Sequence, residues 1–539
     1  MKKLIVIFGI LITTFTACSD FIEEENLSSV SAESFYLTPE GYEALINSNY
    51  AQLKEIYGGA PWLFCAGTDL YAEGRTKEPD GLSKYTQLNS SSEGVAQLYN
   101  TCYKAIQNAN MALYYSGITS QTNKISTLVG EVKYLRANAY FLLVQTYGGV
   151  ALVTDYISSP VLSFNRNSAE EVYTQIIKDL DDALLSVGTG TYNGRVNKRA
   201  VQDLLARVYL TRGYESFGSV SDFTKAAALA DEVIAGQSLS LTFDQLWRPG
   251  NEMNSEVVFS VQYSSASTST SPTTLGNMQS VFFGPYLGGA EVAGKAPYRS
   301  YNLLPTDFAL GLYTKEDSRW KGTFMTEIYA RYYDFYDKAD LSTTLITDFY
   351  EPKWFTAQDK IDYLKKPNLA PNLRYHSWGT HSAQVVSLDY ATIPVRKFDD
   401  PKSPFGILTR VSTRDIILAR LGATYLIAAE AYLKTNPATG LTRLNEVRRR
   451  AGVGPATLGE FNIDYLLDES ARELLGEYHR WFELKRTGKL VERASLHHYL
   501  IQASNFNGAN GQLKILRPIP QEALDLNQNK SFPQNPAYQ

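Results

Sequence analysis

Pairs of segments with helical spacing recur along the chain, each pair about 35 residues long. In residues 414–433 the apolar side chains return every three or four positions, and after a short break residues 441–451 repeat the pattern before Gly452. Glycine is a common stop signal after a helix, so this stretch predicts a helical hairpin. Two further pairs fall within 122–236, and another is divided by residues 58–93. Four degenerate pairs of this kind predict a mainly α fold built on tetratricopeptide-like helical repeats.

Local capping signals mark where some of these helices begin. Thr38-Pro39 places a capping side chain before a proline at the first helical position. Ser168 and Glu171 have the spacing of a capping box. Residues 470–490, which combine charged and aromatic side chains, are expected to form one further helix after the hairpin.

The block from 237 to 410 has a different character from the rest of the chain. Helical periodicity fades there, and Gly, Pro, Ser, Thr, Tyr and Trp dominate. Short strands are predicted at Glu256–Tyr263 and Ile393–Phe398, and a short helix at Asn302–Tyr313. We interpret the block as a loop-rich insert carried by the helical body. Together with the long irregular stretch at 58–93, it is the expected ligand-binding face, because long loops in compact proteins are usually functional.

The first residues have the pattern of an export signal. A positive start is followed by an apolar run up to Ile12 that is too short for a mature membrane span. Thr16-Ala17-Cys18 then resembles a lipobox, which predicts cleavage after Ala17 and a lipid on Cys18. The alternative is an ordinary secretory cleavage site beside an incidental cysteine. The acidic run Glu23–Glu25 is either part of a surface-export signal or a solvated tether.

These features divide the chain into five parts that together make one compact body behind a tether. Residues 1–17 are the predicted signal peptide and 18–37 the lipidated tether. The N-terminal helical repeats occupy 38–236, the insert 237–410, and the hairpin with its following scaffold segment 411–539.

Composition and motifs exclude several classes of function. The net charge of −5 argues against nucleic-acid binding. The five histidines form no HExxH frame and no CxxC occurs, so neither a metal site nor a cofactor is predicted. No G-x-S-x-G elbow is present. After Cys18, only Cys65 and Cys102 remain, and they are either a disulfide or two buried thiols.

Acidic residues leave one catalytic alternative open, since a glycosidase needs only a suitably placed pair of carboxylates. With 56 acidic residues, the sequence alone does not exclude such a pair. The densest charged and aromatic cluster is expected to hold the helical scaffold rather than bind a ligand, because its members are one-turn neighbours on a helix. That cluster is Glu473, Glu477, Arg480, Trp481 and Arg486.

The order of several sequence phrases resembles the SusD/RagB family of surface lipoproteins. Those phrases include "AEAYL" with "LNEVRRRAGV", "RELLGEYHRWFELKRTGKL", and the closing "LRPIPQEALDLN" with "PQNPAY". Earlier counterparts are "GEVKYLRANAYFLLVQTYGGVALV" and "LLPTDFALGLYTKEDSRWKGTF". The likeness covers nearly the whole mature chain, and these phrases belong to the scaffold rather than to a ligand site.

The resemblance implies a non-catalytic protein on the cell surface, lipid-anchored to the outer membrane. It implies capture of an oligosaccharide or polysaccharide, or of a peptide in the RagB branch, for a partner SusC-like TonB-dependent transporter. A secreted glycoside hydrolase is the remaining alternative.

Candidate ligand residues lie in the two irregular blocks, where no helical periodicity assigns them to a repeat core. Sugars require flat aromatic faces together with polar groups for their hydroxyls. The aromatic candidates are Trp62, Tyr71, Tyr85, Tyr286, Tyr298 and Trp354, and the polar candidates are Asp69, Arg75 and Asn89.

Overall fold

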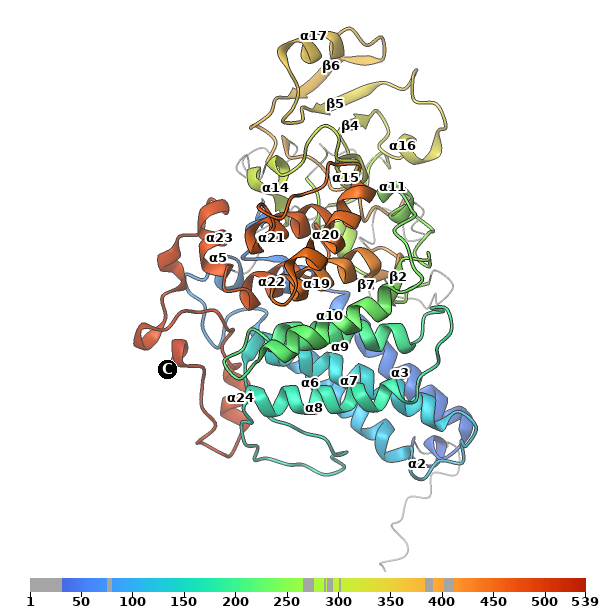
Figure 1. Ribbon diagram of the computed structural model, residues 1–539, viewed down its shortest axis with the longest axis vertical. Coiled ribbons are helices and arrows are strands. Elements are labelled where there is room, and N and C mark those ends of the chain that lie inside the picture. Colours follow the sequence, from blue (N-terminus) through green and yellow to red (C-terminus); the bar gives the residue numbers. More distant parts are fainter. Residues whose placement is uncertain are drawn as a thin grey trace, which may run out of the picture.

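The computed structural model shows four helical hairpins stacked along one body (Figure 1). It describes residues 32–74, 80–264, 276–285, 287, 294–299, 302–382, 391–401 and 411–539. The hairpins are α3 (Pro39–Tyr57) with α6 (Val95–Tyr115), α7 (Ile125–Tyr147) with α8 (Ala169–Leu184), α9 (Lys198–Arg212) with α10 (Val220–Ile234), and α19 (Leu421–Leu433) with α20 (Pro437–Ala451). Helix α6 also packs on α7, and α10 packs on α19 although nearly 200 residues separate them. The predicted mainly α repeat fold is therefore confirmed.

The predicted caps are also confirmed. The Thr38 hydroxyl accepts a hydrogen bond from the Gly41 amide at 3.0 Å, at the start of α3. Ser168 and Glu171 form a reciprocal capping box at the start of α8. Gly452 ends α20 with a φ of +78°, a conformation that favours glycine.

Two predictions about the C-terminal region are wrong. Residues 416–420 are not helical: they form strand β7 (Ile416–Arg420), which pairs antiparallel with β2 (Val257–Val261), and the helix starts only at Leu421. The predicted helix over 470–490 is divided between α21 (Ile463–Glu473) and α22 (Arg480–Arg486). Gly476 makes the break, since its φ is +79° and an added Cβ would lie 2.3 Å from the Phe398 ring.

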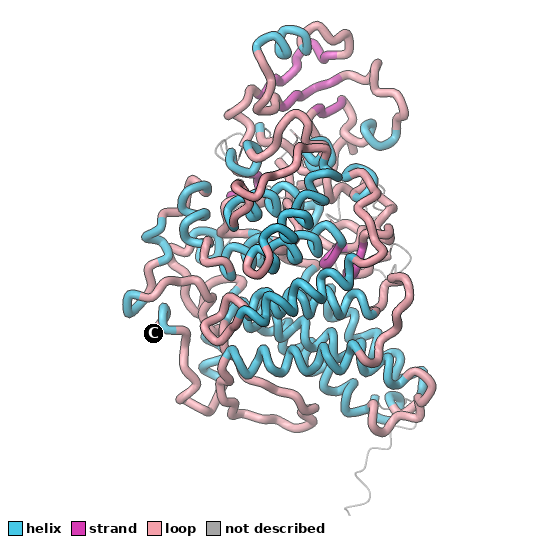
Figure 2. Tube along the Cα trace, in the orientation of Figure 1, coloured by secondary structure: helices cyan, strands magenta, loops and turns pink. Residues whose placement is uncertain are grey.

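The insert carries a small three-stranded sheet that projects from the body (Figures 1 and 2). We call residues 327–376 the sheet lobe. Strand β5 (Ile346–Tyr350) lies in the middle, antiparallel to β4 (Glu327–Tyr329) and parallel to β6 (Leu369–His376). Two short helices complete the lobe, α16 (Asp334–Asp337) and α17 (Ala357–Tyr363).

Other parts of the two irregular blocks pack against the helical body. Strand β1 (Tyr71–Ala72) pairs with β3 (Leu304–Pro305) across more than 200 residues of chain. The predicted helix at 302–313 shortens to α14 (Asp307–Gly311). The predicted strand at 393–398 is wrong, since only an isolated bridge joins Val395 to Phe324.

The remaining short elements complete the described chain. The α-helices are α2 (Ala32–Tyr36), α4 (Trp62–Cys65), α5 (Asp80–Lys84), α11 (Phe243–Leu246), α13 (Gln279–Phe282), α15 (Arg319–Thr323), α23 (Leu490–His497) and α24 (Gln521–Leu526). The 3₁₀ helices are η2 (Ala503–Phe506), η3 (Ala509–Gly511) and η4 (Pro536–Tyr538). Cys65 and Cys102 are both buried thiols and do not form a disulfide.

The charged and aromatic cluster around Glu473 and Glu477 holds the scaffold together, as predicted. Glu473 accepts hydrogen bonds from Arg319, Arg420 and Arg450, and Glu477 from Arg420 and Lys397. We call Arg319, Arg420, Arg450, Glu469, Glu473 and Glu477 the buried ion cluster. Arg480 pairs with Asp69, the Trp481 indole donates to Tyr85, and Arg486 pairs with Glu430. These contacts join the 58–93 block, the insert and the C-terminal helices into one core.

Candidate functional site

Four predicted ligand residues of the first irregular block pack in the core of the protein. Trp62, Asp69, Tyr71 and Tyr85 were all candidates for ligand contact, and all four side chains are buried. The prediction for these residues needs correction, because their partners come from distant parts of the chain. A glycan on the surface does not reach them in this structure.

The carboxylate of Asp69 is bound by two arginines inside the protein. Its side chain is fully buried and accepts from Arg480 at 2.8 and 2.6 Å and from Arg493 at 3.0 Å. Burial alone would raise the pKa of Asp69, but the two arginines outweigh burial, and the pKa lies below its usual value. Asp69 therefore stays ionised and fixes the position of Arg493.

The aromatic candidates of this block also satisfy internal partners. The Gly476 amide donates to the Tyr71 hydroxyl. The Tyr85 hydroxyl donates to the Gly67 carbonyl at 2.8 Å, and its ring stacks on Phe506 with centroids 3.9 Å apart. Trp62 packs so closely that a Cβ on Gly94 would lie 2.4 Å from its ring.

The remaining predicted residues differ in their exposure. Asn89 is exposed, but its carboxamide bonds within its own turn, to Gln87 and Ser91. Tyr298 and Trp354 are half-buried, and Trp354 packs edge-on against Trp320 at 5.2 Å. Arg75, Tyr286 and the predicted lipid-bearing Cys18 lie outside the described residues.

An open groove of about 490 Å³ lies where α14, α23 and the segments following β5 and β6 meet. We call it the Trp378 groove. It is lined by Asp307, Phe308, Gly311, Leu312, Lys353, Trp378, Leu496 and His497. The insert and the C-terminal segment thus form it together, and none of its lining residues comes from the described part of 58–93.

Aromatic rings form two sides of the groove. Phe308 and His497 stack with ring centroids 3.7 Å apart and an angle of 16° between their planes. Arg493 lies 5.2 Å from the Phe308 ring centroid and forms an ion pair with the buried Asp69. Asp69 therefore fixes the arginine that packs on one wall of the groove. Trp378 is half-buried, its ring meets His381 edge-on at 5.7 Å, and its amide donates to the Glu351 carboxylate.

Polar groups and open space lie between these rings. The Lys353 ammonium donates to the Gly311 carbonyl at 3.1 Å. A Cβ on Gly311 would lie 3.8 Å from that ammonium and 4.0 Å from the Trp378 ring, so glycine keeps the floor open between them. Burial lowers the pKa of His497, so its imidazole is neutral at neutral pH. The groove thus offers ring faces with a carboxylate, an ammonium and a neutral imidazole.

The sequence contained a usable signal for Trp378 but not for its neighbours. Trp378 sits in Ser377-Trp-Gly-Thr380 within the insert, and the criterion that selected Trp354 applies equally to it. Phe308 and His497 lie in short helices, α14 and α23, and only the fold brings their rings together.

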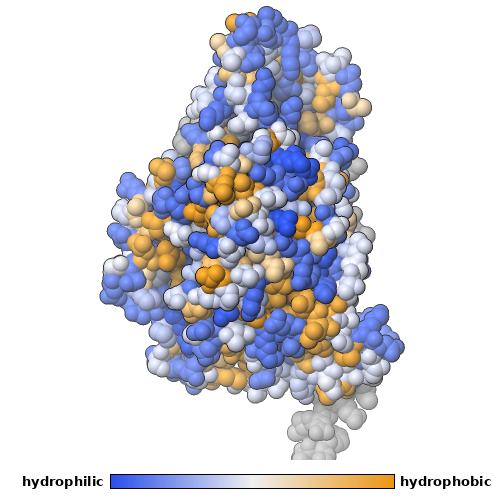
Figure 3. Space-filling view, viewed as in Figure 1, coloured by the Kyte–Doolittle hydropathy of each residue, from blue (hydrophilic) through white to orange (hydrophobic). Residues whose placement is uncertain are grey.

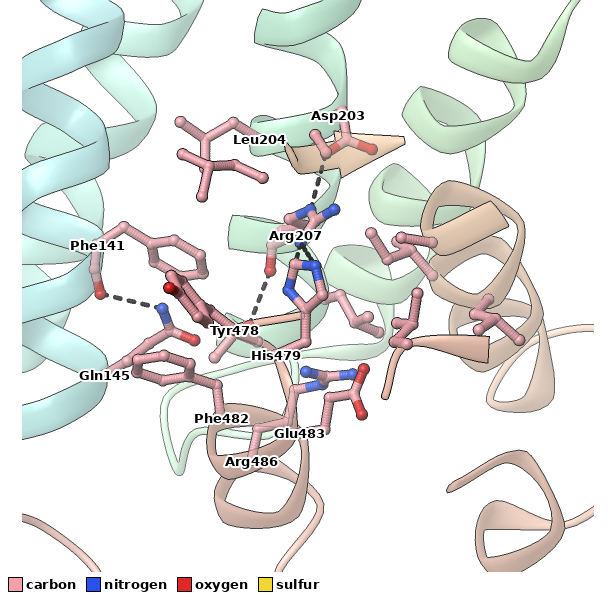
Figure 4. Close-up of a pocket in the computed structure, with 18 of the residues that line it drawn as sticks. Phe141, Gln145, Asp203, Leu204, Arg207, Tyr478, His479, Phe482, Glu483 and Arg486 are labelled. Atoms are coloured by element: carbon pink, nitrogen blue, oxygen red, sulfur yellow. Dashed lines mark hydrogen bonds and ion pairs between the residues drawn. The ribbon is translucent and has the colours of Figure 1, made fainter. Parts of the chain in front are cut away.

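A second cavity, shown in Figure 4, is enclosed within the helical body. It lies between α7, α9, α19 and the chain around α22, and its volume is about 110 Å³. Arg207 bonds to the His479 ring at 2.9 Å, and burial with this neighbouring charge holds the pKa of His479 well below its usual value. These buried, mutually paired groups belong to the packing of the repeats.

A third, larger groove of about 530 Å³ runs between α6, residues 151–164 and α24. Its lining is dominated by aliphatic and aromatic side chains, among them Ile106, Val161 and Leu526. A sugar site needs polar groups that converge on the hydroxyls, so this groove is the poorer candidate.

Comparison with known proteins identifies the family of the chain. A family model described as "SusD family" matches residues 255–538, more than half of the chain. The chain belongs to the SusD family. A second model matches residues 20–210 of this SusD-family protein, and its family is described as "Starch-binding associating with outer membrane".

Relatives and solved structures agree with this assignment. "SusD-like protein P2" of Formosa agariphila is 24% identical over the full length of both chains. A solved laminarin-binding SusD-like protein is 23% identical, with a TM-score of 0.68 over 93% of this chain and 99% of its own. Surface glycan-binding protein A from Bacteroides fluxus is 18% identical, with a TM-score of 0.68 over 93% and 99%. These structures share the fold.

Proposed function

We propose that this SusD-family protein captures oligosaccharides at the Trp378 groove without catalysing their cleavage. The observation that carries the proposal is the open groove itself, in which Trp378 and the Phe308–His497 stack flank Asp307 and Lys353. Glycan-binding proteins among the similar solved structures support the ligand class.

The chemistry of the groove suits a sugar. The apolar C–H face of a pyranose packs on an aromatic ring, and Trp378 offers such a ring in the groove beside the Phe308–His497 stack. Asp307 accepts hydrogen bonds from hydroxyls, Lys353 donates, and a neutral His497 does either, depending on its tautomer. An open groove also leaves room for a chain that continues beyond the bound units.

Catalysis finds less support in the same groove. Glycoside hydrolysis needs two carboxyl groups on either side of the scissile bond. Among the described lining residues, Asp307 is the only carboxylate. The nearby Glu351 is engaged, since it accepts from the Tyr375 hydroxyl at 2.5 Å and from the Trp378 amide at 3.3 Å. This arrangement favours binding over hydrolysis.

The direct test is a glycan array and a peptide array probed with the purified mature protein. We expect binding to at least one class of glycan, no binding to peptides, and no release of reducing ends from any bound glycan. Binding to peptides alone would favour the RagB-like alternative. Turnover that survives repurification and disappears on Asp307→Asn would favour a hydrolase.

We further propose that a lipid on Cys18 anchors the protein at the cell surface, where it serves a SusC-like TonB-dependent transporter. No helix in the described residues is long and apolar enough to cross a membrane. Attachment through a diacylated cysteine is compatible with this, since two acyl chains hold a protein stably where one does not.

Membrane fractionation tests the anchor and the partner together. Labelled palmitate should enter the wild-type protein and not Cys18→Ser, and extraction in mild detergent should recover the wild type with a TonB-dependent transporter. Equal labelling of the two proteins would refute the anchor. Recovery of the labelled wild type as a lone monomer in several mild detergents would count against the partner.

A further inference from the structure

A pocket of about 210 Å³ lies between the sheet lobe and an earlier part of the insert, outside the Trp378 groove. That earlier part contributes Leu287, Lys295 and Ala296. The lobe contributes Ile328, Tyr329, Ala330, Tyr332, Thr347, Asp348, Asn372 and Arg374. No lining residue is shared with the Trp378 groove, so the two are distinct surfaces of the insert.

Strand pairing fixes the charged groups of this pocket. Asp348 on β5 lies opposite Arg374 on β6, and its carboxylate accepts from Arg374 Nε at 2.6 Å and Nη2 at 2.8 Å. His376 and the Thr347 hydroxyl also bond to this carboxylate. Burial would raise the pKa of Asp348, but the bonds from His376 and Arg374 outweigh burial, and the pKa is lowered. The bidentate pair holds the guanidinium plane of Arg374 in one orientation.

The balance of charge in the pocket is positive. Among the described lining residues, Lys295 and Arg374 are two cations against the single carboxylate of Asp348, which Arg374 already engages. Asn372 lies two residues before Arg374 on β6, hence on the same face of the strand, and its carboxamide adds a further donor. Three nitrogen donor groups therefore line one cavity: the Lys295 ammonium, the Arg374 guanidinium and the Asn372 amide.

We propose that this pocket binds the negatively charged substituent of an acidic sugar, a carboxylate or a sulfate ester, between Lys295 and Arg374. A charged oxygen group accepts hydrogen bonds from both cations, whereas a neutral hydroxyl gains less from them. The face of the lobe that is visible at the top of Figure 3 is largely hydrophilic. The inference rests on the proposed capture of glycans and adds a preference for acidic ones.

The test compares D-glucuronate and D-glucose 6-sulfate with neutral D-glucose, by saturation-transfer NMR on the full mature protein at low salt. We expect the acidic sugars to bind about five- to tenfold more tightly than glucose, an advantage that shrinks as salt is added. Preference for both acids supports the shared chemistry, and preference for one of them identifies the carboxylate or the sulfate as the source.

Matched variants locate the effect. Lys295→Gln should reduce the acidic preference to about twofold or less, because one of the two cations is gone. Lys365→Gln, which removes an exposed lysine that follows α17 on the same lobe, should leave it unchanged. Equal binding of acidic and neutral sugars by the wild type would overturn the proposal, as would an acidic preference that survives Lys295→Gln in full.

A third variant tests whether the acidic preference arises in this pocket or in the Trp378 groove. In Trp378→Ala, neutral glycans should bind weakly while the preference for D-glucuronate over D-glucose remains. Loss of the preference together with neutral binding would mean that both effects belong to the Trp378 groove, and the separate acidic pocket would then be wrong.

Discussion

Replacing Glu473 with glutamine is expected to lower the free energy of unfolding by about 3–5 kcal/mol, because it removes a buried carboxylate that three arginines share. Glu473 is fully buried and accepts from Arg319, Arg420 and Arg450, which come from three different parts of the chain. Arg319 and Arg420 are themselves fully buried. A neutral amide accepts at only one atom, so it does not replace a carboxylate shared by three guanidinium groups.

Urea unfolding followed by circular dichroism measures this effect, with Glu492→Gln as the control. Glu492 pairs with Lys489 at the surface, where its side chain is 60% exposed, so its loss should change stability by about 0.5 kcal/mol or less. A change of less than about 1 kcal/mol in Glu473→Gln would show that the buried ion cluster is not a major source of stability.

The acid limb of the stability curve provides an independent check on Glu473. Burial would raise its pKa, but Arg450, Arg420 and Arg319 hold the pKa far below the usual value of 4.5. A carboxylate with a depressed folded-state pKa contributes stability above its unfolded pKa and loses it as pH falls toward the folded value. Glu473→Gln should therefore unfold with a shallower dependence on pH below about 4.5 than the wild type.

The repeat architecture was predictable because its signals are local. Helical spacing, the Ser168–Glu171 capping box and the Gly452 stop are each contained within a few turns of one helix. The errors arise where tertiary contacts decide the conformation. Residues 416–419 are a continuous apolar run that fits a helix or a strand, and residues 416–420 form β7 because β2 pairs with them from about 160 residues away.

The candidate site was less predictable because the fold determines which loop residues reach the surface. Tyr71, Tyr85 and Asp69 fit the composition of a sugar site, but Gly476, Trp481 and Arg480 bury them from more than 390 residues away. Composition does not encode such pairings. The insert was correctly predicted as irregular, yet within it only the meeting of α14 with α23 and the lobe distinguishes Trp378 from other aromatic residues.

Replacing Trp378 with alanine is expected to weaken binding of the preferred neutral glycan at least about tenfold while the protein stays folded. A ring that stacks on a sugar contributes roughly 0.5–1.5 kcal/mol beyond the apolar area it buries, and a half-buried indole also loses that area. Trp378 is half-buried and follows the sheet lobe, so truncation should leave the helical core intact.

Calorimetry on Trp378→Ala tests this expectation against Tyr114→Ala, in which an aromatic ring that is 54% exposed on α6 is removed far from the groove in the sequence and fold. The control should bind like the wild type. Phe308→Ala should weaken binding in the same direction as Trp378→Ala, because its ring forms the opposite part of the groove with His497. If both groove variants are folded and bind as tightly as the control, the glycan does not occupy this groove.

The half-buried Tyr298 and Trp354 then become the aromatic positions to vary, since they are the two predicted rings that the described structure leaves partly exposed.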